Sequence, residues 1–187
     1  PKRSPPKRSP PKRSSPKRSP PKRSPPKRSP KPQPVPGTPG IPPKFRQIVE
    51  DCTLNRKVWK IQKMLGKGAY GAMYMTCYAD NCNYALKVQN KDESFYTEVE
   101  ALAALQHTGV VPKLYAAWTC EDFAYFVIEK LTECSGMSEN DFFIQVKKKI
   151  KEIHRAGWYH NDIHEENIMC RGDSEVIFID FGMASKV

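Results

Sequence analysis

The stretch Tyr159–Met169, YHNDIHEENIM, places two histidines, three carboxylates and two asparagines within eleven positions. Such a density of polar side chains is typical of a metal centre, a solvated acidic loop or a reaction centre. His160 and His164 have the spacing of two zinc ligands on one helix face, but Asn161 stands where the HExxH zinc motif has its glutamate. The flanking sequence must therefore decide among the three interpretations.

The first 40 residues have a composition unlike that of the rest of the chain. They contain thirteen Lys and Arg and no Asp or Glu, so residues 41–187 hold the other eighteen basic and all twenty acidic residues, a net charge near −2. The tail repeats Lys-Arg-Ser-Pro-Pro and offers nothing apolar to bury, which predicts disorder. A Pro/Gly-rich linker follows, so we predict a disordered tail and linker over 1–43 and a folded domain over 44–187.

Two interpretations of the tail stay open. Paired Lys and Arg side chains neutralise phosphates, so residues 1–31 could bind nucleic acid or another polyanion. The same residues could simply form a solubilising extension. Serines that precede prolines in this basic context also resemble sites of proline-directed kinases, and phosphorylation there would cancel much of the positive charge.

The composition argues against secretion and membrane insertion. No apolar run approaches the roughly 20 residues of a spanning helix, and the N-terminus lacks the hydrophobic core of a signal peptide. The six cysteines form no CxxC pair, so neither a zinc ribbon nor a disulfide framework is predicted. Cys77 and Cys82 could face each other across a hairpin, but we expect free thiols and an intracellular protein, cytoplasmic or nuclear, with no membrane partner.

Apolar periodicity predicts an α+β fold with a sheet-rich first half. Helices are expected over 93–107, where apolar residues recur at helical spacing, and over 138–157, where Ser138 precedes Asp141 by three residues as in a capping box. A further strand is expected over 175–182. The five strands of the predicted sheet are 58–65, 72–78, 83–89, 113–119 and 123–130.

A glycine-rich loop joins the first two predicted strands. Gly66, Gly68 and Gly71 fit the pattern G-x-G-x-x-G, which dinucleotide-binding folds and kinases share. In a dinucleotide-binding fold this loop leads into a helix, whereas here it leads into another strand. The context therefore favours a hairpin folded over phosphate groups, whose oxygens the backbone N–H groups can approach closely.

Four motifs, GKGAYGAMY, YALKV, HNDIHEEN and IDFG, occur in the order and approximate spacing of the protein kinase superfamily, which the chain resembles over residues 58–186. In FYTEVEAL and in the loop pattern it resembles vaccinia-related and other large-DNA-virus serine/threonine kinases, which implies a host-cell location if the source is viral. The resemblance implies a kinase-like fold, with a five-stranded antiparallel N-lobe and one helix over about 58–131. A truncated helical C-lobe is expected over about 138–187.

The resemblance also implies a site for ATP and Mg²⁺. Lys87 matches the lysine that binds the α- and β-phosphates. Its glutamate partner is expected on the first helix, where Glu98 fits the inward face better than Glu100 does. Glu100 is predicted to lie at the surface.

The stretch at 159–169 acquires roles from the same resemblance. Asp162 matches the catalytic aspartate, and Asn167 and Asp180 match the two metal-binding side chains. Ile128 matches the residue that controls access to the back of the adenine pocket. The other positions that the resemblance assigns to the nucleotide are Gly66, Lys67, Gly68, Ala69, Tyr70, Gly71, Met73, Ala85, Glu129 and Leu131.

Departures from the family pattern leave three functions open. Asn161 replaces an arginine that pairs with a phosphorylated activation segment in many kinases, and His164 replaces the lysine usual in serine/threonine kinases. Only five residues follow Asp180-Phe181-Gly182. We expect phosphoryl transfer to protein Ser/Thr hydroxyls. The alternatives are a small-molecule kinase, which His164 favours, and a pseudokinase or scaffold with a nucleic-acid-binding tail.

Overall fold

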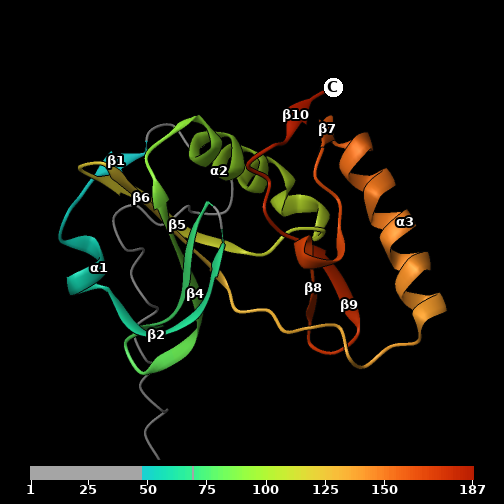
Figure 1. Ribbon diagram of the computed structural model, residues 1–187, viewed down its shortest axis with the longest axis horizontal. Helices are drawn as coiled ribbons and strands as arrows, with labels where there is room; N and C mark the ends of the chain where they lie inside the picture. The colour runs from blue at the N-terminus through green and yellow to red at the C-terminus, as the bar shows by residue number, and fades with distance from the viewer. Residues whose placement is uncertain (1–47, 69) are drawn as a thin grey trace, which may run out of the picture. The chain divides into compact units, whose positions relative to one another are not determined.

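The computed structural model describes residues 48–68 and 70–187 (Figure 1). The predictions for the tail and linker over 1–43 and for Ala69 lie outside these residues. In chain order the first half contains β1 (Val49–Glu50), α1 (Leu54–Lys57), β2 (Trp59–Gly68), β3 (Gly71–Tyr78), β4 (Asn81–Asn90), α2 (Glu93–Leu105), the 3-10 turn η1 (Gln106–Thr108), β5 (Leu114–Cys120) and β6 (Phe123–Glu129). The second half contains α3 (Glu139–Arg155), β7 (Trp158–Tyr159), η2 (Glu165–Asn167), β8 (Ile168–Arg171), β9 (Glu175–Phe178) and β10 (Ser185–Lys186).

The first half forms one sheet with the strand order β1-β5-β6-β4-β3-β2. Strands β2 to β6 are antiparallel neighbours, at the places where the sequence predicts strands. The sixth strand corrects the five-stranded prediction, because Val49 and Glu50 pair in parallel with Trp118 and Thr119. Two residues are too few to show an apolar period, so no sequence pattern marked β1.

Alternation along the strands gives the sheet two apolar faces. On β4, Ala85 belongs to the inner core with Phe95 and Val99 of α2. The next residue, Leu86, belongs to a second cluster on the opposite face, together with Trp118. Helix α2 therefore covers one face of the sheet (Figure 1). Aromatic side chains and Leu54 of the short α1 segment cover the other.

Local capping explains where the two longer helices begin. The side chain of Asp92 accepts a hydrogen bond from the backbone N–H of Phe95, which satisfies a free donor in the first turn of α2. Ser138 does the same for Asp141 at the start of α3, as the sequence predicts. After α3 the chain reverses at Gly157, whose φ of 84° is accessible to glycine without strain.

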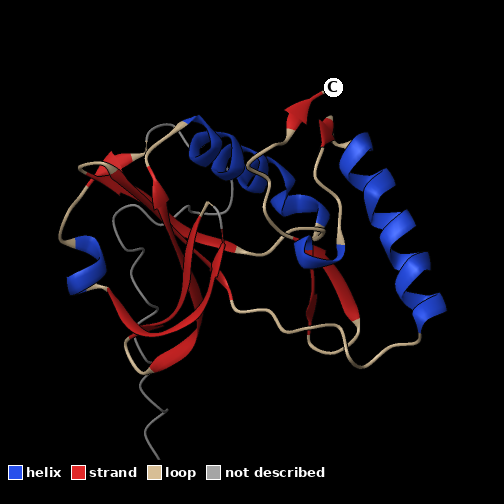
Figure 2. Cartoon of the chain, viewed as in Figure 1, coloured by secondary structure: helices blue, strands red, loops and turns tan. Residues whose placement is uncertain are grey.

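The second half contains α3, the short β7–β10 ladder and the hairpin of β8 and β9. In the hairpin, Ile168 pairs with Phe178 and Arg171 with Glu175. Helix α3 lies on the side of the hairpin away from the sheet (Figure 2). Val176, Ile177 and Phe178 are buried, so the hairpin forms the core of this half and holds the loops at its ends in place.

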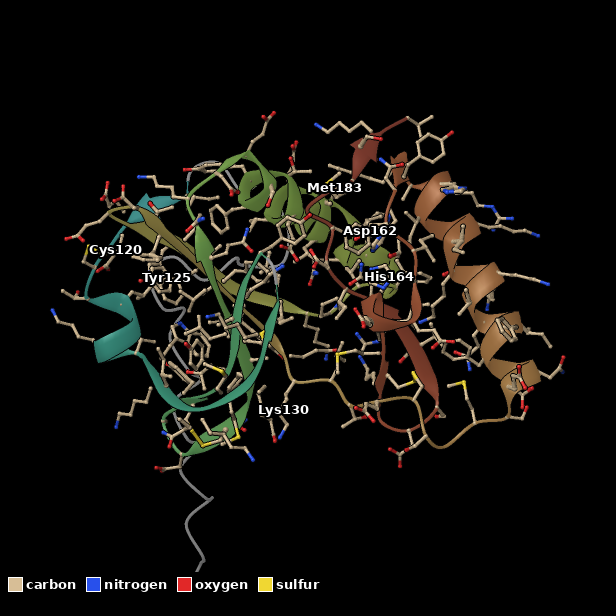
Figure 3. The ribbon with its side chains drawn as sticks, in the orientation of Figure 1. Cys120, Tyr125, Lys130, Asp162, His164 and Met183 are labelled. Atoms are coloured by element: carbon tan, nitrogen blue, oxygen red, sulfur yellow. A yellow bond between two sulfur atoms is a disulfide. The ribbon has the colours of Figure 1, made fainter. Side chains whose placement is uncertain are left out.

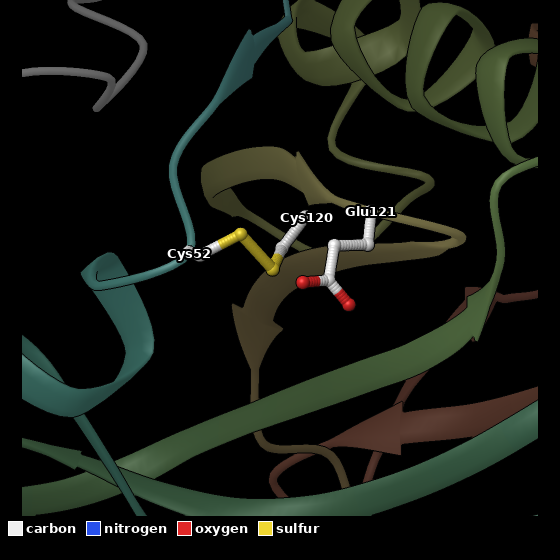
Figure 4. A group of neighbouring side chains, drawn as sticks. All are labelled: Cys52, Cys120 and Glu121. Carbon is white, nitrogen blue, oxygen red and sulfur yellow. A yellow bond between two sulfur atoms is a disulfide. The ribbon is translucent and has the colours of Figure 1, made fainter.

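The cysteines contradict the prediction of free thiols. All six lie in the described residues and pair as Cys52–Cys120, Cys77–Cys82 and Cys134–Cys170. Figure 4 shows the first pair beside Glu121. These three residues could in principle hold a metal, but the disulfide occupies both sulfurs. The sequence separations of 68 and 36 residues explain why no spacing motif marked two of the pairs.

No helix among the described residues is both long enough and apolar enough to cross a membrane.

The disulfides should differ in their contribution to stability. Cys52–Cys120 spans 68 residues and Cys77–Cys82 spans 5, so the first removes more conformational entropy from the unfolded chain. Replacing both cysteines of a pair with serine should lower the free energy of unfolding by about 4 kcal/mol for the long loop and about 2 kcal/mol for the short one. Urea denaturation without reductant measures both, and equal losses would contradict the ranking.

Candidate active site

A cavity of about 430 Å³ lies between the glycine-rich hairpin, α2 and the loops that flank β8 and β9. It brings together most residues that the sequence assigned to ATP and Mg²⁺, although they are separated by up to 114 positions in the chain. The predicted residues that line it are Gly66, Lys67, Gly68, Tyr70, Gly71, Met73, Lys87, Glu98, Ile128, Asp162, Asn167 and Asp180.

Lys87 is held at the centre of the cavity by two carboxylates. Its Nζ lies 2.7 Å from Oε2 of Glu98 and 3.3 Å from Oδ1 of Asp180. Glu98 is 2% exposed, whereas Glu100 lies at the surface and pairs with Lys186. The structure thus turns Glu98 inward and Glu100 outward, as the helical face predicts.

Burial and charge act against each other on this ion pair. Burial alone would lower the pKa of Lys87, but the carboxylates of Glu98 and Asp180 outweigh it and raise that pKa. For Glu98, burial raises the pKa while the ammonium of Lys87 opposes the rise. The short Nζ–Oε2 distance favours the charged form of the lysine, so a cation faces the cavity.

Backbone geometry fixes the glycine-rich hairpin over the cavity. Strand β2 pairs with β3 so that Gly68 lies opposite Gly71. A Cβ at Gly71 would clash with the carbonyl oxygen of Val88 on the next strand, so packing requires glycine there. Cβ atoms at Gly66 and Gly68 would meet nothing within 4 Å, so the protein's own packing does not demand glycine at these two positions.

One side-chain amide organises the loop that carries Asp162. The Nδ2 atom of Asn167 donates to the backbone oxygen of Asp162 at 2.9 Å and to its Oδ2 at 3.0 Å, and it lies 2.9 Å from Nε2 of His164. Asn167 is buried, so its rotamer is fixed by packing as well. Figure 3 shows Asp162 and His164 side by side, and their carboxylate oxygen and Nε2 are 3.5 Å apart.

Two residues near the cavity adopt the left-handed backbone conformation that few side chains tolerate. The φ angles are 65° for Asn161 and 61° for Asp180. The side chain of Asn161 donates to the backbone oxygen of Met183 at 3.0 Å and to Oγ of Ser185 at 2.9 Å. It thereby fastens the loop to the segment that follows Asp180-Phe181-Gly182.

His160 is buried between the loop that carries Asp162 and the segment that carries Asp180. It is 1% exposed, and its ring centroid lies 4.4 Å from that of Phe181. Nε2 donates to the carbonyl oxygen of Ile179 at 2.9 Å, while Nδ1 accepts from the backbone N–H of Asp162 at 3.3 Å. Residues 160–164 form no helix, and His164 is exposed, so the two histidines do not form the zinc pair that their spacing allowed.

The donor set suits a hard divalent cation. Carboxylate and amide oxygens are the ligands that Mg²⁺ prefers. Lys87 contacts only Oδ1 of Asp180, and the contacts of Asn167 within the loop use its nitrogen, so among the described residues each side chain keeps an oxygen for a ligand. Both residues line the same cavity, and they fit a shared metal ion.

Comparison with known proteins identifies the family of the chain. Residues 59–187 match the family model "Protein kinase domain". The chain belongs to the protein kinase family. Among its curated relatives are a probable serine/threonine-protein kinase 2 of Plasmodium falciparum, 29% identical over 70% of this chain and 29% of that protein, and the serine/threonine-protein kinase MAK of mouse, 27% identical over 67% of this chain and 23% of that protein.

A probable casein kinase I homolog of Encephalitozoon cuniculi is 29% identical over 68% of this chain and 46% of that protein. The chain therefore spans between about a quarter and a half of the length of these kinases. The matched residues 59–187 contain strands β2 to β6, α2 and the Asp162 loop, which carry the residues that line the cavity.

Three residues assigned to the nucleotide do not line the cavity. Ala85 faces the inner core, the side chain of Glu129 turns to Arg171, and Leu131 is 9% exposed in the segment that leaves β6. Family members contact the nucleotide near Glu129 and Leu131 through backbone groups, so their roles stay predictions. The lining residues to which the sequence assigned no nucleotide contact are Ala72, Leu102, Pro112, His164, Glu166, Phe126 and Ile179.

The buried ring of His160 should make stability depend on pH. Burial lowers its pKa, although its hydrogen bond to Ile179 opposes the change. As the pH falls below about 6.5, histidine in the unfolded chain takes up a proton before folded His160 does. The stability gained from the neutral ring is therefore present above that pH and lost below it.

We expect the difference in free energy of unfolding between the wild type and His160→Gln to shrink as the pH falls from 7.5 to 5. Denaturant titrations at several pH values measure this difference. A difference independent of pH would show that His160 does not titrate in this way.

Proposed function

We propose that this kinase domain transfers the terminal phosphoryl group of ATP to Ser or Thr hydroxyls of proteins, with Mg²⁺. The observation that carries the proposal is the convergence of Lys87, Asp162, Asn167 and Asp180 on one cavity, each held by a defined partner. Loss of any of the four would have favoured a scaffold. The names of the curated relatives support the same activity.

Each side chain has a distinct task in this proposal. Bound ATP supplies the phosphoryl group, and Mg²⁺ neutralises the charge on its phosphates. Lys87, fixed by Glu98, presents its ammonium to the phosphates. The carboxylate of Asp162, held by Asn167, accepts the proton of the acceptor hydroxyl and orients it. Asn167 and Asp180 would hold the metal through their remaining oxygens.

One observation favours a second candidate, a small-molecule kinase. The His164 side chain is 46% exposed beside Asp162, where serine/threonine kinases usually have lysine. An imidazole there replaces a long cation that would reach the transferred phosphate. An assay with both protein and small-alcohol acceptors distinguishes the two candidates.

The location of the protein remains the prediction made from the sequence, intracellular and cytoplasmic or nuclear. The three disulfides argue against a reducing compartment, because such bonds persist where thiol reductants are scarce. The proposal of phosphoryl transfer does not depend on the compartment.

Two glutamates of α2 provide a matched test of the activity. With radiolabelled ATP, Mg²⁺ and a general protein substrate, Glu98→Gln should lower the rate by about 100-fold, because Lys87 loses the charge that positions it. Glu100→Gln should change the rate little, because its ion pair with Lys186 is exposed. Asp180→Ala should abolish transfer.

Label that appears only on small alcohols would establish the second candidate instead. Absence of any Asp180-dependent transfer, with nucleotide still bound, would reject catalysis in favour of a scaffold.

The tail supports a separate proposal of nucleic-acid binding. Residues 1–40 hold thirteen of the 31 basic residues and no acidic one. Deleting them should abolish retention on DNA or RNA at low salt, because binding of this kind comes from counterion release and weakens as salt rises. Electrophoretic mobility shifts of the full chain and the deletion at two salt concentrations measure the effect. Equal shifts for both proteins would refute the role.

A further inference from the structure

The β8–β9 hairpin carries both metal-side residues at one end. Asn167 directly precedes β8, and Asp180 follows β9 by two positions. Four paired positions, from Ile168↔Phe178 to Arg171↔Glu175, join the strands. Three residues of strand span about 10 Å, so the hairpin is a short rigid unit whose two ends move together.

Arg171, at the other end of the hairpin, is bound to three separate segments. Its Nε donates to Oε1 of Glu129 at 2.8 Å, its Nη1 to Oε2 of Glu175 at 3.0 Å, and its Nη2 to the backbone oxygen of Val111 at 3.3 Å. Glu175 is its partner within the hairpin. Glu129 ends β6, and Val111 lies just before β5, so two of the three contacts reach the sheet half of the domain.

Both of those contacts adjoin the wall of the cavity. Ile128 directly precedes Glu129, and Pro112 directly follows Val111, and both line the cavity. The guanidinium therefore connects two walls of the cavity. The hairpin carries one wall through Asn167 and Asp180, and the two segments before β5 and at the end of β6 carry another through Pro112 and Ile128. None of the three residues that it contacts lines the cavity itself.

The residue next to Arg171 adds a second brace. The backbone N–H and carbonyl of Cys170 exchange hydrogen bonds with Thr132, at 2.8 and 3.0 Å, and its side chain forms the disulfide with Cys134. Thr132 and Cys134 belong to the connection between β6 and α3. Two adjacent residues of β8 thus fasten the chain just after Ile128 to the hairpin.

The charges make the Arg171 contacts specific. Glu129 is 9% exposed, so its carboxylate depends on the guanidinium for compensation. Burial opposes the charge on Arg171, but its hydrogen bonds with Glu129 and Glu175 outweigh that effect and raise its pKa. Glu175 also pairs with Lys149 of α3 at 3.0 Å. A lysine or glutamine at 171 could not reproduce three directed contacts from one planar group.

We propose that Arg171, braced by the Cys134–Cys170 disulfide, is a positioning residue that sets how the two walls of the cavity face each other and thereby sets nucleotide affinity. Without Arg171, the connection after β6 samples more arrangements, and a smaller fraction of the molecules is competent to bind the nucleotide. The apparent dissociation constant then rises in inverse proportion to the competent fraction. The inference rests on the proposed function in naming a nucleotide as the ligand.

The two carboxylates that bind Arg171 supply matched variants. Glu129→Gln weakens the link between the two halves, whereas Glu175→Gln weakens a link within the hairpin. A fluorescent ADP analogue with Mg²⁺ should bind Arg171→Gln and Glu129→Gln about tenfold more weakly than the wild type. Glu175→Gln should bind it within about twofold, and the Arg171→Gln/Glu129→Gln double variant should be no weaker than Arg171→Gln alone.

Thermal denaturation of each variant separates this role from a merely stabilising one, with binding measured at least 15 °C below each midpoint. A lower midpoint with unchanged affinity in Arg171→Gln would overturn the proposal, as would equal weakening by Glu129→Gln and Glu175→Gln. Should the wild type bind neither ADP nor ATP, the proposed function fails instead. In that case, amide hydrogen exchange over residues 129–134 tests the positioning role of Arg171. Arg171→Gln should accelerate the exchange, and Glu175→Gln should leave it unchanged.

The disulfide is tested by reduction. A dithiol gives two electrons and two protons to the S–S bond and closes to its own cyclic disulfide, leaving Cys134 and Cys170 as thiols. Reduction should weaken ADP binding by about threefold. The Cys134→Ser/Cys170→Ser variant should bind as the reduced protein does and not respond further. The Cys77→Ser/Cys82→Ser variant should still bind ADP more weakly after reduction. An unchanged affinity on reduction of this variant would show that the Cys134–Cys170 disulfide does not brace Arg171.

Discussion

The ion pair between Lys87 and Glu98 is the constraint on which the site depends. A buried ammonium is tolerable only when a carboxylate lies against it, so α2 must pack on the sheet with this one face inward. The same lysine contacts Asp180, which requires the segment after β9 to lie under the sheet with Phe181 buried. One pair of charges therefore fixes a helix, a sheet and a loop from three parts of the chain.

Much of this arrangement could be predicted from the sequence, because the local residue patterns favour the same structure as the contacts of the folded chain. Strands β2 to β6 fall in segments rich in apolar and aromatic residues, and α2 and α3 begin at side chains that cap them. Glu98 could be distinguished from Glu100 because residues two apart on a helix point in different directions. In these cases the residue pattern is enough to predict where an element lies and which way its side chains point.

Other features depend on partners distant in sequence, and no local pattern could reveal them. Strand β1 exists only because β5 offers an open edge. The pairing of Cys134 with Cys170 requires β8 to lie beside the connection after β6. The turn of Glu129 away from the cavity depends on Arg171, 42 positions later. Pro112 and Leu102 line the cavity as ordinary apolar residues, and only the folded chain shows which apolar residues border a ligand site.

The amide of Asn161 has a consequence of another kind. Where many kinases hold the segment after the metal-binding aspartate by an arginine and a phosphate, this chain uses hydrogen bonds from Asn161 to Met183 and Ser185. Both partners are neutral. Mobile ions screen attractions between charges and leave dipolar contacts of this length almost unaffected. The hold of Asn161 on this segment is thus insensitive to ionic strength, unlike the exposed ion pair of Lys186 with Glu100 in the same segment.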